Sequence, residues 1–315
     1  MTDLLCIGLT TLDIVARPVD RLPDGDGFAL LEGIEVVPAG TACGAALVAA
    51  RLGLSVALSG AVGDDRNGRF VRTELESQGV DTALLRTIAG MPTSTTILPI
   101  DTAGRRPILH AFGAALAAGL GPEDRAAACK ARFVHWGGVG GPKLDGGPGA
   151  ELLAQASAAG AIVSCDLITP GPGARDEIKR LLPHVDWFLP SATEALALSG
   201  AANLAEASAY FRALGAKGVV IKNGGDGVHA LLPTGEHRDF SAHDIVPVDT
   251  TSCGDSFCAG FIAALASGRP PHLAIEFAGA TAALVALGLG TLGRLENFEK
   301  TDTARREMPL KKVVG

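Results

Sequence analysis

The sequence predicts an α/β fold in which helices cover both faces of a central, mostly parallel sheet, with a small second β-sheet attached to it. Short runs rich in Val, Ile and Leu, typical of strands buried on both faces, alternate with longer segments of helical apolar spacing. Two other segments have a strand, turn, strand pattern with no helix between the strands. At 315 residues, the chain has room for one large domain and a modest addition.

The elements of the main sheet follow one another in regular alternation, which favours parallel pairing. Buried strands are predicted at 4–9, 55–63, 132–138, 161–168, 186–190 and 218–223. Helices are predicted at 43–53, 67–79, 149–160, 193–200, 203–215 and 256–268. The uncharged run at 277–293 predicts a buried helix rather than a membrane span, because it is rich in Ala and Gly and of borderline length.

Two segments break this alternation. Residues 12–38 and 92–112 are predicted as hairpins, with turns in PDGDG and DTAGRR. Because a few strands alone cannot form an independent core, we expect them to form a small sheet that acts as a lid over a cleft. The main domain would then comprise 1–11, 39–91 and 113–300, and the polar residues 301–315 would be a surface tail.

Composition and charge exclude several functional classes. The chain has 27 basic and 34 acidic residues and no Lys/Arg stripe, so nucleic acid is not an expected partner. Its six cysteines lack CxxC spacing and its N-terminus lacks a signal-peptide pattern, so we expect a reduced, cytoplasmic protein with no membrane partner. No P-loop, protein-kinase, HExxH or GxSxG motif is present. The GLGTLG at 288–293 matches a dinucleotide pattern, but it follows a helix-like run and is interpreted as a helix exit loop.

The stretch DTTSCGDSF at 249–257 connects a strand end to a buried helix. Its small residues let backbone N–H groups converge at a helix N-terminus, where unpaired amides and the helix dipole favour an anion such as phosphate. Asp255 stands at the start of the same helix, where it would act as a base on a hydroxyl beside that phosphate. The alternative for Asp255 is an ordinary N-cap, a position at which Asp is common.

This stretch resembles the DTxGAGD hallmark of the ribokinase-like, or PfkB, carbohydrate kinases. Five other segments are similar to motifs of that family and occur in the family's order: 8–13 (GLTTLD), 38–53, 60–82, 189–195 (LPSATEA) and 221–227 (IKNGGDG). The resemblance implies a ribokinase-like fold and an enzyme that uses ATP and Mg²⁺ to phosphorylate a hydroxyl of a small sugar or sugar acid.

The resemblance also implies a role for each matching residue. The catalytic set would be Asp255 as general base with the backbone amides of Ser252, Cys253 and Gly254 around the phosphoryl group. The substrate set would be Asp13, Gly40, Thr41 and Gly44, and the nucleotide set Lys222, Asn223, Gly225, Gly227, Ser191 and Gly279. Glu194 would organise Mg²⁺ through water, and Asp249 would belong to a loop that holds a monovalent cation such as K⁺ in many relatives. Asp13 as a turn residue and Glu194 as a solvated helix residue are the alternatives.

Departures from the family pattern leave the substrate open. Ser252 and Cys253 stand where Gly and Ala are usual, Gly44 replaces an asparagine, and Ser191 replaces the Asn of Asn-x-x-Glu. The losses at Gly44 and Ser191 keep open a catalytically degenerate sugar-binding or regulatory protein. Because Cys253 stands at a helix N-terminus, a lowered pKa of its thiol, and with it sensitivity to oxidation, is a further hypothesis.

Other substrates and partners follow from side chains outside these motifs. A nucleoside kinase on the same fold would need an apolar wall, for which Phe28, Phe112 and Trp136 are the candidates. A phosphosugar kinase would need basic groups, and Arg105, Arg106 and His110 are the candidates, although such residues in a turn are commonly solvated. Unpaired edges of the lid strands also favour a homodimer through those strands.

Overall fold

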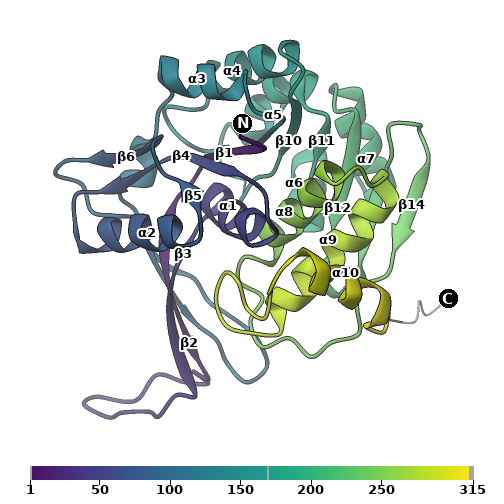
Figure 1. The fold of residues 1–315 in the computed structure, drawn as a ribbon. Helices are drawn as coiled ribbons and strands as arrows, with labels where there is room; N and C mark the ends of the chain where they lie inside the picture. Colours follow the sequence, from purple (N-terminus) through teal and green to yellow (C-terminus); the bar gives the residue numbers. More distant parts are fainter. Residues whose placement is uncertain (1, 169, 312–315) are drawn as a thin grey trace.

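The computed structural model describes residues 2–168 and 170–311. Within these residues, it has a ten-stranded sheet with helices on both faces and a separate four-stranded sheet, called the small sheet below (Figure 1). The predicted α/β fold, with a mostly parallel main sheet and a small second sheet, is therefore confirmed.

The main sheet has the strand order β14-β13-β12-β11-β10-β9-β1-β4-β5, and β6 (Leu85–Ile88) also pairs with β4. Its other strands are β1 (Leu4–Gly8), β4 (Val56–Gly63), β5 (Val80–Asp81), β9 (Phe133–Gly137), β10 (Ile162–Cys165), β11 (Trp187–Phe188), β12 (Gly218–Lys222), β13 (Val228–Leu231) and β14 (His237–Phe240). Pairing is parallel except at the edge, where β13 and β14 are antiparallel. Because β1 pairs with β4 on one side and β9 on the other, a crevice is expected at the carboxyl ends of these strands.

Helices cover the two faces of the main sheet and enclose two separate hydrophobic cores. One core contains residues of α1 (Thr41–Arg51), α2 (Arg66–Ser77), α8 (Cys253–Ala266) and α9 (Pro271–Ala286). The other contains residues of α3 (Pro122–Ala128), α4 (Pro148–Ala158), α5 (Ala174–Leu181), α6 (Ala192–Ser199) and α7 (Leu204–Ala213). The 3₁₀ segments are η1 (Ala114–Ala117), η2 (Leu182–His184) and η3 (Gly224–Asp226). The short helices α3 and α5 were not predicted, because seven or eight residues show little periodicity.

The small sheet has the order β3-β2-β7-β8, formed by β2 (Thr11–Arg17), β3 (Gly33–Ala39), β7 (Thr95–Pro99) and β8 (Leu109–Ala111). Strand β2 pairs antiparallel with β3 and parallel with β7, so it joins the two predicted hairpins into one sheet. Because side chains alternate between the faces of a strand, the register gives the sheet two different faces. One carries a polar row in which Asp13 is paired with Thr96 and Thr96 with His110.

The C-terminal segment corrects one expectation. Residues 298–307 form helix α10 (Phe298–Glu307), so 301–307 belong to a helix and not to a surface tail. The ring of Phe298 stacks on Phe277 of α9 at 4.5 Å between centroids, and Arg305 pairs with Glu276 at 2.9 Å. Two polar residues of this segment form ion pairs, Arg305 with Glu276 of α9 and Asp302 with Arg269 just before α9, while Phe298 packs on α9, so polarity alone gave the wrong expectation. Residues 312–315 of the predicted tail lie outside the described residues.

Helix α9 covers the first part of the run for which a buried helix was predicted. In the part of the chain that the structure describes, none of the helices combines the length and hydropathy that a membrane crossing requires. Residues 288–293 follow α9 as a turn-rich loop, in which Gly290 has a φ of 74°. The interpretation of GLGTLG as a helix exit loop is therefore confirmed.

Candidate active site

A cavity of about 1250 Å³ lies where the carboxyl ends of the central strands face the small sheet. It brings together most of the residues selected from the sequence: Asp13, Gly40, Thr41, Ser191, Glu194, Lys222, Gly225, Gly227, Ser252, Cys253, Gly254, Asp255 and Gly279. Gly44, Asn223 and Asp249 lie outside its wall. Segments far apart in the sequence thus meet around one space.

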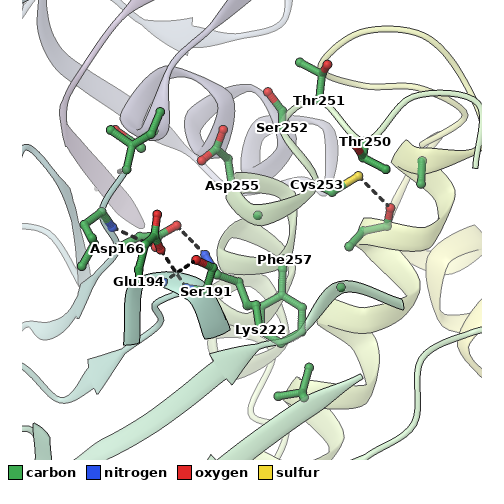
Figure 2. Close-up of a pocket in the computed structure, with 18 of the residues that line it drawn as sticks. Asp166, Ser191, Glu194, Lys222, Thr250, Thr251, Ser252, Cys253, Asp255 and Phe257 are labelled. Atoms are coloured by element: carbon green, nitrogen blue, oxygen red, sulfur yellow. Dashed lines mark hydrogen bonds and ion pairs between the residues drawn. The ribbon is translucent and has the colours of Figure 1, made fainter. Parts of the chain in front are cut away.

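Helix α8 begins in the wall of this cavity (Figure 2). Its N-cap, Ser252, has a φ of 54° and is the one non-glycine residue with positive φ among those described. Holding a non-glycine residue there costs about 1 kcal/mol or more, and such strain is concentrated at functional sites. Ser252 thus has the left-handed backbone conformation that glycine adopts without strain.

The first turn of α8 presents backbone amides to the open space. Within residues 2–168 and 170–311, the amides of Ser252, Gly254 and Asp255 have no hydrogen-bond acceptor, and that of Cys253 reaches the Thr250 carbonyl only at 3.4 Å. Unpaired amides at a helix N-terminus attract an anion. The open cavity in front of them leaves room for one.

The carboxyl group of Asp255 lies beside these amides (Figure 2). Burial raises the pKa of Asp255 to about 7, the negative charge of Asp166 acts in the same direction, and the Lys222 ammonium opposes both. A pKa close to neutrality suits a group that takes up a proton and later releases it.

Lys222, at the end of β12, forms a buried ion pair with Asp166, which follows β10. The Lys222 Nζ lies 2.6 Å from Asp166 Oδ2, and the two side chains are 12% and 3% exposed. Burial works against the charge of Lys222, but Asp166 more than compensates and keeps the pKa of Lys222 above its ordinary value. The same Nζ lies 3.4 Å from the point where a side chain on Gly254 would begin, so a cation stands beside the first turn of α8.

Asp166 was not selected from the sequence. The available signal was its place at the end of a predicted buried strand, since ligands of open α/β sheets bind outside the carboxyl ends of the strands. Further cavity residues that were missed include Arg238, His243, Glu276, Arg305, Leu310 and Lys311. Most of these lie in elements that the sequence pattern did not predict, namely β14 and the C-terminal segment.

Glu194 and Ser191 form a reciprocal cap at the start of α6. The Ser191 N–H donates to Glu194 Oε2 at 2.8 Å, and the Glu194 N–H donates to Ser191 Oγ at 3.3 Å. Burial raises the pKa of Glu194, and Asp166 adds to the effect. No group of three or more His, Cys, Asp or Glu suited to a metal occurs in the described ranges. Asp166 and Glu194 line the same cavity as the first turn of α8, and such a pair of carboxylates fits Mg²⁺, which is commonly held by one or two carboxylates, substrate phosphates and water.

The small sheet supplies the opposite wall. Burial raises the pKa of Asp13, and Thr96 and Thr11 counteract the rise by hydrogen bonding. Arg106 Nε donates to Thr250 Oγ1 at 3.0 Å, which connects the small sheet to the loop before α8. Arg105, in contrast, is 82% exposed, pairs with Asp101 and lies outside the cavity wall.

The aromatic candidates are not brought together. Phe112 lines the cavity, whereas Trp136 is fully buried in the core and Phe28 is 85% exposed outside the cavity wall. The apolar wall expected of a nucleoside site is therefore largely missing from these three residues.

Three residues outside the open wall have structural partners. The Asp249 carboxylate accepts from the Thr251 amide at 2.7 Å and from the Gly290 amide at 2.9 Å, so it fastens the loop before α8. The backbone N–H of Asn223 donates to the Gly227 carbonyl at 2.8 Å and closes a turn. Gly44 lies on α1, and a Cβ added to it would be 2.9 Å from Asp255 Oδ2. Asp255 thus fills the space beside Gly44.

The hypothesis of a lowered Cys253 pKa is wrong. Burial raises the pKa of this thiol to about 12, and Asp249 adds to the rise. The Sγ atom lies 3.7 Å from the Ala282 carbonyl and 3.9 Å from that of Asp249. Burial and the neighbouring carbonyl oxygens disfavour the thiolate, so the helix dipole does not lower the pKa of this thiol.

Gly44→Ala tests the role of base expected for Asp255 from the sequence. On that expectation it lowers kcat by about tenfold to a hundredfold with little change in KM, because displacing a reacting group by about 1 Å costs up to that factor. The added methyl would have to push the Asp255 carboxylate out of its position. Steady-state kinetics measures the effect. Gly119→Ala is the matched control, since a Cβ there makes only an ordinary contact of 3.7 Å with Lys143. A Gly44→Ala enzyme with the kcat of the Gly119→Ala enzyme would contradict the prediction.

Comparison with known proteins identifies the family. The family model described as pfkB family carbohydrate kinase matches residues 1–297. The chain belongs to the PfkB family of carbohydrate kinases. It is 32% identical over 290 residues to an ATP-dependent ribose-1-phosphate kinase of Halopiger xanaduensis, covering 91% of this chain and 92% of that protein. It is also 32% identical over 268 residues to a fructokinase of Klebsiella pneumoniae, covering 81% and 84%.

The solved structures agree with this PfkB assignment at the level of the fold. A ribokinase II of Escherichia coli in complex with ATP and Mg²⁺ has a TM-score of 0.82 and 22% identity, covering 97% of this chain and 99% of that one. The PfkB chain is thus an enzyme with the ribokinase fold, and in general terms an ATP-dependent sugar kinase.

Proposed function

We propose that this PfkB kinase transfers the terminal phosphoryl group of ATP to a hydroxyl of a small sugar or sugar acid, with Asp255 as general base. The observation that carries the proposal is the first turn of α8, where a carboxylate of raised pKa and unpaired amides face the same cavity. Deprotonation of the acceptor and capture of the phosphoryl group would then take place at one helix terminus.

Each part of the site has a role in this reaction. Asp13 and Thr96 orient the acceptor through its hydroxyls. Asp255 takes the proton as the acceptor oxygen forms its bond to phosphorus and the bond to the ADP oxygen breaks. The amides of Ser252 and Gly254, together with Lys222, stabilise the charge on the phosphoryl oxygens. Closure of the small sheet over the acceptor would exclude water, which otherwise competes for the phosphoryl group.

The nucleotide and its metal have candidate positions in the same cavity. Gly279 leaves open wall for the nucleotide, since a Cβ there would meet nothing within 4 Å, and Gly225 and Gly227 line the cavity as well. Asp166 and Glu194 would hold Mg²⁺ together with phosphates and water, and the metal would supply charge neutralisation there. Asp249 fixes the neighbouring loop, and activity in KCl against choline chloride decides whether that loop takes a monovalent cation.

The test of the proposal is a turnover assay with ATP, Mg²⁺ and a panel of sugars, sugar acids and nucleosides. Phosphorylation of a sugar or sugar acid is the expected result. Phosphorylation of nucleosides alone would instead assign the enzyme to that class. Binding of a sugar without turnover of any acceptor would favour the degenerate binding protein.

We further propose a homodimer formed through the strands of the small sheet. The face opposite Asp13 carries an apolar row across all four strands, in which Ile14 is paired with Val36 and Ile97, and Ile97 with Leu109. Val36, Ile97 and Leu109 are 42%, 45% and 55% exposed. An exposed apolar row of this kind favours association with a second copy.

Ile97→Glu is therefore expected to convert a dimer into a monomer, because it places charges in the middle of the apolar row. Sedimentation velocity at micromolar concentration measures the change. Val246→Glu is the control, since Val246 is 86% exposed and lies outside the small sheet. A wild-type protein that sediments as a monomer would rule out the dimer.

A further inference from the structure

We infer that the acceptor of this kinase carries an anionic group, a phosphate monoester or a carboxylate, and that Arg106 and His110 of the segment around β8 bind it. The inference rests on the proposed function and narrows its substrate class. It depends on three features of the cavity: an arginine without a carboxylate partner among the described residues, a histidine in the same cross-strand row as Asp13, and the position of that arginine next to the start of α8.

The first feature is the contrast between two adjacent arginines. Arg105 is directed outward and is neutralised by Asp101, with Nε 2.5 Å from Oδ2. Arg106 lines the cavity, and no carboxylate within residues 2–168 and 170–311 forms an ion pair with it. Among the described residues, the Arg106 side chain makes one hydrogen bond, from Nε to the neutral Thr250 hydroxyl. The terminal nitrogens are therefore left to donate to a ligand, and a guanidinium fork matches the oxygens of a carboxylate or a phosphate.

The second feature is the position of His110. The register places it in one row with Thr96 and Asp13 on the cavity face of the small sheet. His110 Nδ1 lies 3.1 Å from Thr96 Oγ1, which orients the ring, and Phe112 packs against the ring with centroids 4.8 Å apart. The other ring nitrogen, Nε2, has no partner among the described residues. It is a second group able to donate to an anion.

The third feature is how these groups lie relative to Asp255. Asp13 and Thr96 suffice to bind the neutral hydroxyls of a sugar, and this binding needs no cation. Arg106 acts on Asp13 and on the Cys253 side chain, since its charge opposes the rise in the pKa of both. Arg106 Nε is hydrogen-bonded to Thr250, two residues before the Ser252 N-cap, so Arg106 lies next to the start of α8. An acceptor with its anionic group on Arg106 and His110 would keep a hydroxyl free for Asp255.

The experiment compares matched acceptors that differ in charge, using wild type, Arg106→Gln and Arg105→Gln. The probes are ribose with ribose 1-phosphate and ribose 5-phosphate, fructose with fructose 6-phosphate, and glucose with gluconate. We expect the wild type to have a kcat/KM at least about tenfold higher for a charged member than for its neutral partner, since hydrogen bonds to charged groups are worth that factor. The phosphate and carboxylate arms decide which anion is preferred.

Arg106→Gln is expected to reduce this preference by about tenfold to a hundredfold, mainly through KM for the charged acceptor. Arg105→Gln should retain the wild-type preference, because Arg105 is directed away from the cavity. His110→Gln is expected to reduce the preference less than Arg106→Gln.

The outcomes separate this inference from the proposed function. Faster turnover of neutral sugars than of every charged partner would overturn the inference while the kinase stands. An equal loss of kcat for neutral and charged acceptors in Arg106→Gln would also overturn it, since Arg106 would then act on the transferring phosphoryl group. Charged probes that raise the melting temperature of wild type but not of Arg106→Gln, without turnover of any acceptor, would support the inference and refute the proposed function.

Discussion

Asp255→Asn is expected to lower kcat by about a hundredfold to ten-thousandfold while the KM values for acceptor and ATP stay close to those of the wild type. Asparagine has nearly the shape of aspartate, so the side chain still fits beside Gly44 and the first turn of α8. It cannot take the proton of the acceptor hydroxyl. Steady-state kinetics gives kcat, and isothermal titration with each substrate shows whether binding is retained.

The pH dependence provides the control for this variant. Because the pKa of Asp255 is raised to about 7, the wild-type kcat/KM should increase with pH through about 7 as the base loses its proton. Asp255→Asn should lack this limb. A variant that keeps wild-type turnover, or a wild type with no change of rate between pH 5.5 and 8, would remove Asp255 from the mechanism.

Unfolding cannot account for the expected loss of activity. The folded pKa of Asp255, about 7, lies above the ordinary value of 3.8, so the folded state binds this proton more tightly than the unfolded state. Its contribution to stability is therefore present at acidic pH and is lost as the pH rises toward 7 and above. Asparagine carries no charge at any of these pH values, so it removes the free-energy cost of ionising a buried carboxyl group. At pH 8 the melting temperature of Asp255→Asn should equal or exceed that of the wild type.

Lys222→Met is expected to have the largest effect on stability, about 3 kcal/mol in the free energy of unfolding, because it leaves Asp166 as an unpaired buried charge. It should also lower kcat, since Lys222 stands beside the first turn of α8. Urea unfolding at pH 7.5 measures the first effect and steady-state kinetics the second.

Lys217→Met is the matched control for this prediction. Lys217 Nζ lies 2.6 Å from Asp186 Oδ1, the same distance as in the Lys222–Asp166 pair, but the Lys217 side chain is 63% exposed. Exposed pairs contribute about 1 kcal/mol or less. If both variants unfold at the same urea concentration, the Lys222–Asp166 pair does not have the importance assigned to it here.

Local patterns were sufficient for most of the main elements, because each depends on neighbouring residues. The run predicted as a strand at 218–223 is β12, and the helix predicted at 67–79 is α2. The pattern failed for α10, which is held by an ion pair between Arg305 and Glu276 of α9 that no local signal indicates. It also failed for β14, an exposed antiparallel edge strand without an apolar run.

The sequence by itself determined the order of the main strands and helices, the small-residue start of α8 with Asp255, and the motifs by which the chain resembles the PfkB family. These features are encoded in residues that are close together in the chain. Only the tertiary structure decided that Lys222 pairs with Asp166, 56 positions away, that Asp255 fills the space beside Gly44, and that Arg106 rather than Arg105 faces the cavity. The physical reason is that spacing and composition set local conformation, whereas distances between remote side chains are set by how sheets and helices pack.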